Sequence, residues 1–365
     1  MDISSLFAHK YTGRRVLVTG HTGFKGSWLV FWLRAMGAEV CGLALDPDTT
    51  PSHWKLLNIG NVVDQRIELR NAKIVLQAIE DQRPEIIFHL AAQPLVRRGY
   101  QEAAETFAIN IMGLVNILEA VRKTNSVRAV VNATTDKVYR EKVAHSGYVE
   151  NDELGGYDPY STSKACAELV SACYRSSFFC ASFKGRPHVA LATARAGNVI
   201  GGGDWAEDRL IPDIIRAATS GDPLVIRNPN AVRPWQHVLE SLSGYLRLGQ
   251  SLLNGEDVED SWNFGPSSDA AMPVHALVHQ MQSEWPNLRF DFSAESHPHE
   301  AASLLLDSSK AAKYLGWRSV WNADTSISYT ARWYREFYEC GRINTADDLY
   351  TYVADARSLG LSWTL

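Results

Sequence analysis

A glycine-rich turn between a short apolar strand and a helix constrains the fold more than any other feature. Residues 15–19 are typical of a buried strand, and Gly20, Gly23 and Gly26 follow it in the spacing GxxGxxG. A helix and a second apolar strand, 39–46, complete a βαβ unit. Gly20 permits the tight turn, Gly23 lets the backbone approach a pyrophosphate, and Gly26 lets the helix pack on the strand. The turn therefore predicts a dinucleotide site at a helix N-terminus.

Asp46 ends the second strand of this unit. A carboxylate at this position accepts a hydrogen bond from the adenosine ribose and repels a 2′-phosphate. We therefore expect NAD rather than NADP as the cofactor. The alternative is that Asp46 is a solvated residue at the end of a strand.

Strands and helices continue to alternate up to about residue 195. Continuous apolar strands between helices are typical of a parallel sheet covered on both faces. The predicted helices are 72–82, 107–123 and 160–182, and the predicted strands are 85–90, 129–133 and 189–193. These elements predict an α/β fold, a Rossmann-type doubly wound parallel sheet.

The length of 365 residues, at about 150 residues per domain, indicates roughly two domains. We expect residues 1–195 to form the dinucleotide-binding domain. Residues 196–365 are expected to form mainly a smaller, mixed α/β substrate domain. The strand–helix alternation becomes less regular in this second region, and part of 236–265 is expected to return to the first domain.

The composition excludes several functional classes. The net charge is −5, so there is no basic surface for nucleic acid or anionic lipid. No apolar run approaches the roughly 18 residues of a membrane helix, and the first residues lack a signal-peptide pattern. The five cysteines contain no CxxC, which gives no zinc or disulfide framework. We expect a cytoplasmic protein without a metal site.

Tyr160 and Lys164 form a YxxxK motif in a predicted helix. Residues i and i+4 share a helix face, so the phenol and the ammonium can converge on one ligand. A Tyr with a pKa near 10 is a poor base at neutral pH, but a nearby cation favours the phenolate. Such a Tyr can take a hydroxyl proton while a hydride leaves the same carbon.

Thr135, Asp136 and Lys137 directly follow the predicted strand 129–133. They therefore lie at the carboxyl edge of the sheet, where doubly wound folds bind ligands. Thr135 could hydrogen-bond a substrate oxygen together with Tyr160. A simple dehydrogenase would not require the ionisable pair Asp136 and Lys137, for which the alternative is a solvated turn.

The motifs in this order resemble extended short-chain dehydrogenases/reductases, and within them the CDP-D-glucose 4,6-dehydratases. The resemblance covers about residues 15–317. It rests on the strings GHTGFKGSWL, HLAAQPLVRRGY, NATTDKVY, ARAGNVIGGGDWAEDRLIPD and RPWQHVLE. It implies bound NAD, conversion of CDP-glucose to a 4-keto-6-deoxy sugar nucleotide for surface polysaccharide, and a homo-dimer or homo-tetramer.

The resemblance also implies catalytic roles. Tyr160 would be the base for the C4 hydroxyl, Lys164 its partner, and Thr135 a ligand of the C4 oxygen. Asp136 would protonate the departing C6 hydroxyl. Related dehydratases have Glu where this chain has Lys137, and there the Glu removes the C5 proton. Lys137 would act either as a neutral base or as a charged stabiliser of the enolate.

Further binding residues are carried over from the matched motifs. The candidate cofactor contacts, besides those already given, are Thr22, Phe24, Glu68, Leu69, Ala91 and Ala92. Glu68-Leu69 stands where the family usually has Asp-Ile, and Glu is longer than Asp. The candidate substrate contacts are Gln93, Asn198, Arg209, Arg227 and Arg233. Arginine forks suit phosphate groups.

Three other functions compete with that of a CDP-D-glucose 4,6-dehydratase. A nucleotide-sugar 4-epimerase on the same fold needs the Tyr and Lys but no acid–base pair for water loss, so Asp136 and Lys137 argue against it. A dehydratase acting on another nucleotide sugar also remains open. A non-catalytic NAD-binding sensor would keep the glycines and lose Tyr160 or Lys164, and both are present.

Overall fold

The computed structural model describes residues 2–142, 147–180, 188–226, 228–267, 271–286, 288–292 and 305–365. Within these residues, seven parallel strands form one sheet in the order β11-β6-β5-β4-β1-β2-β3. The strands are β1 (Arg15–Thr19), β2 (Glu39–Ala44), β3 (Val62–Arg66), β4 (Ile86–His89), β5 (Ala129–Ala133), β6 (Ala190–Arg195) and β11 (Ser261–Asn263). Strands β2 and β3 follow on one side of β1, and β4, β5, β6 and β11 follow on its other side. This change of side between β1 and β4 creates the crevice where such folds bind ligands.

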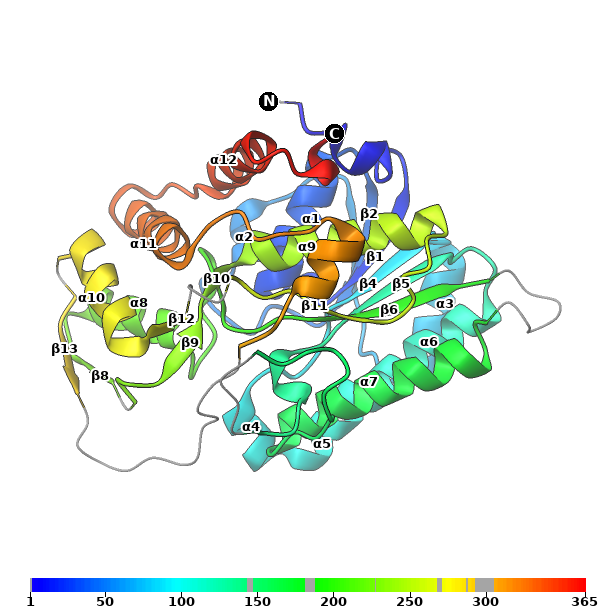
Figure 1. The fold of residues 1–365 in the computed structure, drawn as a ribbon, viewed down its shortest axis with the longest axis horizontal. Coiled ribbons are helices and arrows are strands. Elements are labelled where there is room, and N and C mark those ends of the chain that lie inside the picture. The colour runs from blue at the N-terminus through cyan, green and yellow to red at the C-terminus, as the bar shows by residue number, and fades with distance from the viewer. Residues whose placement is uncertain are drawn as a thin grey trace.

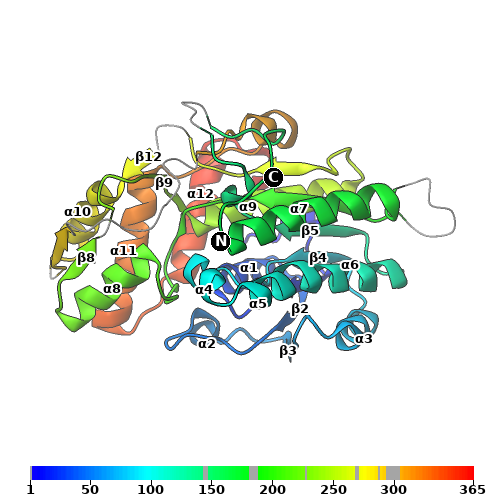
Figure 2. The same cartoon turned by 90° about the horizontal axis from the view of Figure 1, so that it is seen from below.

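Helices cover both faces of this sheet, which confirms the predicted Rossmann-type fold (Figure 1). Helices α1 (Phe24–Ala35) and α9 (Val238–Asn254) lie on one face. On the other face lie α3 (Ala72–Gln82), α6 (Gly113–Lys123) and α7 (Pro159–Ser177), as Figure 2 shows from below. Alternate residues of β1 enter different cores: Val16 and Val18 pack toward α1 and α9, and Leu17 packs toward α3 and α6.

The edge strand β3 was not predicted. Its sequence VVDQR is largely polar, and all five of its side chains are at least partly exposed. An edge strand has a neighbour on one side only, so it does not require the continuous apolar run that identified the central strands.

The second part of the chain builds a small mixed α/β region beside the sheet (Figure 1). There β8 (Leu224–Ile226) pairs with β13 (Phe290–Phe292), and β9 (Val232–Pro234) pairs with β12 (Ala271–Pro273). The helices of this region are α8 (Leu210–Ser220), α10 (Val274–Glu284) and α11 (Ala323–Cys340). Two short strands, β7 (Val199–Ile200) and β10 (Gln236–His237), pair where the chain leaves the large sheet and comes back to it.

The remaining helical segments are shorter or lie outside these layers. They are α2 (His53–Leu57), α4 (Val96–Gln101), α5 (Ala103–Phe107), α12 (Thr345–Ser358), a π-helical turn at Ala108–Met112, another at Ala311–Leu315, and 3-10 turns at Leu6–His9, Asp136–Val138 and Ser362–Thr364. The segments α5, the π-helical turn at Ala108–Met112 and α6 follow one another without a break. The predicted helix 107–123 is therefore the C-terminal part of this longer helix.

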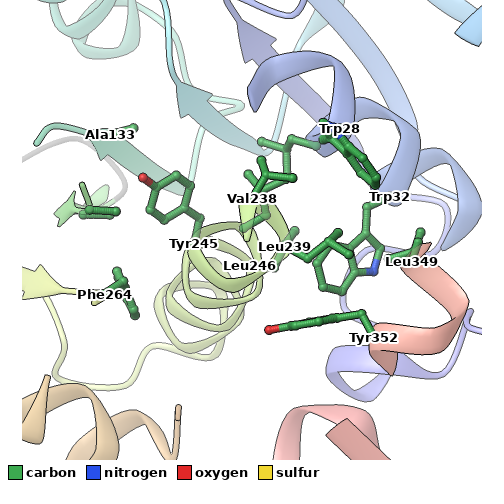
Figure 3. Close-up of a cluster of buried hydrophobic side chains, with 14 of the residues drawn as sticks. Trp28, Trp32, Ala133, Val238, Leu239, Tyr245, Leu246, Phe264, Leu349 and Tyr352 are labelled. Carbon is green, nitrogen blue, oxygen red and sulfur yellow. The ribbon is translucent and has the colours of Figure 1, made fainter. Parts of the chain in front are cut away.

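Large aromatic side chains join the C-terminal helix α12 to the sheet (Figure 3). Trp28 and Trp32 project from α1, Tyr352 comes from α12, and Leu239 and Leu246 come from α9 between them. All five side chains are fully buried, and the Trp32 and Tyr352 rings meet edge to face with centroids 6.0 Å apart. Much of the aromatic content of this chain therefore serves the core rather than a ligand site.

One helix of the described chain, Ala103–Lys123, is long and apolar enough to cross a membrane by length and composition. It is not a continuous apolar run, because Glu105, Asn110 and Glu119 interrupt it. Its residues Leu114, Ile117 and Leu118 are fully buried in the core beneath the sheet. Its length and apolar face are therefore explained by its place as a covering helix of the Rossmann fold.

Candidate active site

The glycine turn has the geometry that its spacing predicts. Gly20 adopts a φ of +72°, and a Cβ there would lie 2.8 Å from the backbone of Ala91. A Cβ on Gly26 would lie 2.1 Å from the Gly20 carbonyl oxygen, so the helix could not pack with any larger residue. By contrast, a Cβ on Gly23 would touch only the Gly20 oxygen, at 3.4 Å. Packing of the described residues therefore does not require glycine at position 23, and its contact with a cofactor stays a prediction.

Replacing Gly23 with alanine separates these two roles. We expect Gly23→Ala to unfold at a temperature close to that of the native protein, because its Cβ meets no close neighbour. We expect its NAD affinity to fall by about tenfold or more, since the methyl occupies the space of the pyrophosphate. Calorimetry measures both quantities, and Gly26→Ala is the comparison that should lose thermal stability. Unchanged NAD affinity in Gly23→Ala would contradict the assignment.

Asp46 lies just beyond β2 with its side chain 86% exposed and paired to Arg66, Nε to Oδ1 2.8 Å. The same guanidinium binds Asp64, whose carboxylate also contacts the buried ring of His21 at 2.7 Å. Gly42 leaves room for this ring, because a Cβ there would lie 2.3 Å from it. Asp46 is therefore open to solvent just beyond β2, and Arg66 sets its orientation.

The other predicted cofactor contacts line the same edge of the sheet. The Thr19 hydroxyl accepts the amides of Leu90 and Ala91, both at 3.1 Å, and so fixes the turn that leads to Ala92. Thr22 donates to the Leu45 carbonyl at 3.0 Å. Phe24 is half-buried at the start of α1.

The predicted adenine contacts differ in exposure. Glu68 is half-exposed and pairs with Arg70 at 2.7 Å, and that pairing holds the pKa of its carboxyl below the usual value. Leu69 is buried, and its carbonyl accepts the Asn116 amide at 2.8 Å.

Gln93 is buried, and its polar groups are bound to neighbouring residues. Its amide nitrogen donates to the Leu95 carbonyl at 3.1 Å and to the Thr106 hydroxyl at 2.8 Å, and its oxygen accepts the Leu95 amide at 2.6 Å. Its backbone amide donates to Asn110 at 2.8 Å. These contacts favour a role in shaping the turn after β4 over direct contact of its side chain with substrate.

Tyr160, Thr135 and Lys164 meet above the end of β5. Asp158 caps α7 by accepting the Ser161 amide at 3.0 Å, which begins the helix one residue before Tyr160. The Tyr160 phenol hydrogen-bonds with Thr135, and burial raises the pKa of Tyr160 to about 12. Lys164 Nζ donates to the Ala133 carbonyl at 3.0 Å, and burial lowers the pKa of Lys164 to about 8. The Lys164 ammonium is therefore still charged at neutral pH.

Asp136 is 2% exposed and has both carboxylate oxygens occupied. Its Oδ1 accepts the Thr135 hydroxyl at 2.9 Å, and its Oδ2 accepts the Asn198 amide at 3.3 Å. Gly197 packs directly against it, because a Cβ on Gly197 would lie 1.8 Å from Oδ2. Residues from two strand ends, β5 and β6, thus hold one carboxylate beside Thr135.

Lys137 is half-buried in the 3-10 turn after Thr135. The Thr135 hydroxyl accepts its backbone amide at 3.4 Å. Within the described part of the chain, the structure assigns its ammonium neither an ion pair nor a hydrogen bond. This arrangement leaves the amine available to a ligand.

The three arginines predicted to bind substrate lie in different surroundings. Arg209 pairs with Asp204, Nη1 to Oδ2 2.8 Å, and lies close enough to Tyr160 and Lys25 to affect their pKa values. Arg209 therefore lies near the Tyr160 and Lys25 side chains, and its contact with substrate stays a prediction. Arg233 is 7% exposed on β9 and donates to the Val232 carbonyl at 3.0 Å. Arg227 lies outside the described residues.

Two residues near Tyr160, namely Tyr245 and Lys25, were not among the predicted site residues. The Tyr245 hydroxyl, on α9, points toward Ala133 at the end of β5 (Figure 3). Lys25 Nζ donates to it at 3.4 Å, and burial together with Arg209 lowers the pKa of Lys25 to about 7. No local sequence pattern signals Tyr245, because it is 220 residues from Lys25.

A glycine turn at the switch point of a parallel sheet, with Thr, Tyr and Lys at the neighbouring strand end, defines a short-chain dehydrogenase/reductase. Residues 17–330 match the model of the GDP-mannose 4,6-dehydratase family. A CDP-glucose 4,6-dehydratase from Salmonella typhimurium is 46% identical over 328 residues, 89% of this chain and 91% of that protein. The chain therefore belongs to the nucleotide-sugar 4,6-dehydratases of this family.

Solved structures share the fold. A UDP-glucose 4-epimerase from Thermus thermophilus, in complex with NAD, aligns with a TM-score of 0.76 at 24% identity, over 88% of this chain and 99% of that one. A dTDP-glucose 4,6-dehydratase from Streptomyces venezuelae, with NAD and TYD bound, aligns with a TM-score of 0.73 at 23% identity, over 88% and 97%. Epimerases and dehydratases thus share this architecture, and the side chains of the site must distinguish them.

Proposed function

We propose that the chain is an NAD-dependent CDP-glucose 4,6-dehydratase, a hydro-lyase that forms CDP-4-dehydro-6-deoxyglucose. The observation that carries this function is the position of Asp136 and Lys137 directly beside Thr135 and Tyr160. An epimerase needs only the Thr, Tyr and Lys, whereas loss of water also needs an acid and a base. The 46% identity to a CDP-glucose 4,6-dehydratase supports the choice of substrate.

The residues present fit NAD. The free amides at the start of α1 and the open space at Gly23 suit a pyrophosphate, and Asp46 suits a ribose hydroxyl. When bound, NAD supplies a hydride acceptor for oxidation of C4 and later a hydride donor to C6. Because the hydride is returned, the overall reaction is redox-neutral.

Tyr160 and Lys164 carry out the proton transfer at C4. The Tyr160 phenol takes the proton of the C4 hydroxyl, and Thr135 hydrogen-bonds the same oxygen. Burial opposes ionisation of this phenol and raises its pKa to about 12, so a neighbouring positive charge is required. Lys164 supplies that charge at any pH below its own pKa of about 8.

Asp136 and Lys137 carry out the removal of water. A C4 ketone makes the C5 proton acidic, and Lys137 either takes this proton or stabilises the resulting enolate. Asp136, protonated before this step, gives a proton to the departing C6 hydroxyl, so that it leaves as water. When hydride adds to C6, a proton returns to C5, and the proton that Tyr160 took from the C4 hydroxyl replaces the one that Asp136 gave up. Thr135 and Asn198 hold the carboxylate in place for this transfer. Arg209 is placed to neutralise substrate phosphate.

The test of this function is a substrate comparison. The purified protein is incubated with NAD and CDP-glucose, with dTDP-, UDP- and GDP-sugars in parallel. The alkaline chromophore of a 4-keto sugar should develop with CDP-glucose and much more slowly with the others. Activity with dTDP-glucose but not CDP-glucose would overturn both the substrate and the assigned role of Lys137. The product suits deoxysugar synthesis for surface polysaccharide.

We also propose a cytoplasmic homo-dimer that pairs through α7 and the helix 103–123. These helices lie side by side (Figure 2), and each has an exposed apolar side chain, Met112 on the helix 103–123, 50% exposed, and Leu169 on α7, 60% exposed. Exposed apolar side chains on adjacent helices are typical of interfaces. Two such dimers, joined through another surface, would give the alternative tetramer.

Replacing Leu169 with arginine tests this surface. We expect Leu169→Arg to halve the molar mass measured by light scattering, because two buried charges would face each other across the two-fold axis. Leu359→Arg is the matched control, since Leu359 is 58% exposed but follows α12 on another part of the molecule. A Leu169→Arg protein with unchanged mass, or a native protein that is a monomer, would contradict the proposal.

A further inference from the structure

The buried carboxylate of Glu168 has a full set of partners behind the active site. It lies one helical turn after Lys164 on α7 and is 4% exposed. Its Oε1 accepts the Thr134 hydroxyl at 2.5 Å. Its Oε2 accepts the Thr193 hydroxyl at 2.6 Å and Arg195 Nη2 at 2.9 Å. One side chain therefore joins α7 to the carboxyl ends of β5 and β6.

These partners are immediate neighbours of the reacting groups. Thr134 lies between Ala133, whose carbonyl accepts Lys164 Nζ, and Thr135, whose hydroxyl contacts Tyr160. Arg195 ends β6, three residues before the Asn198 that donates to Asp136. A movement of the Glu168 carboxylate would therefore displace both segments that hold the catalytic acid.

The ion pair of Glu168 and Arg195 is buried, with side chains 4% and 3% exposed. Arg195 Nη1 also donates to the Tyr139 hydroxyl at 2.7 Å and to the Glu150 carbonyl at 3.0 Å. Taking two charges out of water costs about as much as their attraction returns, so such a pair adds little to stability. What it supplies is a fixed geometry at the two strand ends.

Among the described residues, Glu168 is the acidic group whose charge acts on Lys164. The charge of Lys164 in turn acts on two basic neighbours, His89 at the end of β4, which burial keeps neutral, and Lys25 on α1. Burial lowers the pKa of Lys164, and Glu168 raises it. Glu168 therefore favours the charged form of Lys164 that Tyr160 needs, and burial opposes it.

We propose that Glu168 is a positioning residue of the dehydratase site, which holds the Thr134–Asp136 segment against α7 and keeps Lys164 charged. The inference rests on the proposed function, because turnover of the nucleotide sugar is the quantity measured. Glu168 itself touches neither substrate nor cofactor in this assignment, and it acts through Thr134, Arg195 and Lys164.

The geometric role is tested with two matched hydroxyl deletions. Thr134→Val and Thr193→Val each remove one hydrogen bond to the same carboxylate from a buried strand end. We expect Thr134→Val to lower kcat by about 10- to 100-fold with little change in KM, because misplacement near the reacting groups has effects of this size. We expect Thr193→Val to lose as much thermal stability as Thr134→Val but to lower kcat much less. Equal effects on kcat would overturn the geometric role.

The electrostatic role is tested by Glu168→Gln and the pH dependence of kcat. Lys164 is charged below its pKa, so removing the carboxylate that raises this pKa should move the alkaline limb of the profile to lower pH by about one unit. Thr134→Val, which removes no charge, should leave the limb in place. Glu119→Gln is the control, because Glu119 also binds an Arg and a hydroxyl but lies on α6, away from the site. An unmoved alkaline limb in Glu168→Gln would overturn this role.

Failure of the proposed function gives a different result. A native enzyme that leaves CDP-glucose unchanged but turns over another nucleotide sugar would overturn the substrate, and the same variants are then compared on that sugar. A native enzyme active on CDP-glucose, with variants that keep its kcat and its pH profile, would overturn the inference about Glu168 alone.

Discussion

Lys137→Met is expected to lower kcat for CDP-glucose by about 10²- to 10⁴-fold, the range that proton-transfer groups contribute. In deuterated solvent the native enzyme should introduce deuterium at C5, and Lys137→Met should lose this exchange in step with product formation. Oxidation at C4 depends on Thr135, Tyr160 and Lys164 and should persist as reduction of bound NAD. Absorbance near that of NADH and mass spectrometry of the sugar measure the two steps. If Lys137→Met kept the native rates of C5 exchange and product formation, the proposed role of Lys137 at C5 would be refuted.

Lys137→Arg then separates the two chemical roles left open for this residue. An Arg side chain stays protonated in proteins, so it cannot accept a proton but can stabilise an enolate. If Lys137 is a neutral base, Lys137→Arg should be as inactive as Lys137→Met. If it is a charged stabiliser, Lys137→Arg should keep a substantial part of the native kcat.

Gly197→Ala is expected to lower kcat by about 100-fold or more, although it adds a single methyl group. The added Cβ would lie 1.8 Å from Asp136 Oδ2, so the carboxylate must turn away from Thr135 and Asn198. The φ angle of Gly197 lies outside the left-handed region, so the backbone itself tolerates alanine. The 4-keto sugar assay measures the effect.

A double-mutant comparison shows whether this methyl acts through Asp136. Residues in contact show non-additive effects, so Gly197→Ala should cost little further activity in an Asp136→Ala background. Gly60→Ala is the control, because a Cβ at Gly60 meets no atom within 4 Å. A full additional loss in the Asp136→Ala background, or native activity in Gly197→Ala, would contradict the explanation.

The sequence predicts features of this molecule that depend on nearby residues. The strand 15–19, the helix 72–82 and the YxxxK motif each lie within one short segment, and the structure has β1 and α3 with those bounds. The edge strand β3 was missed because its polar residues carry no apolar pattern.

Contacts between distant segments could not be predicted in the same way. Glu168 has the sequence signal of standing four residues after Lys164, but its partner Thr134 is 34 residues away. The need for glycine at 197 depends on a carboxylate 61 positions earlier, and no local pattern encodes that contact. Arg66 was likewise not foreseen as the partner of Asp46, because the pair forms only when β2 and β3 align.

The path of the chain through the large sheet has a consequence for folding kinetics. Helix α9 and strand β11 complete one face and one edge of a sheet whose first strand is residues 15–19. The Tyr11 hydroxyl reaches the Leu246 carbonyl, at 2.6 Å, across 235 residues. Contacts at such separations form slowly, and a ribosome adds about 5–20 residues each second. The apolar face of β1 and α1 therefore stays uncovered for on the order of ten seconds or more during synthesis, until α9 has been made. A chaperone would bind this face during that period.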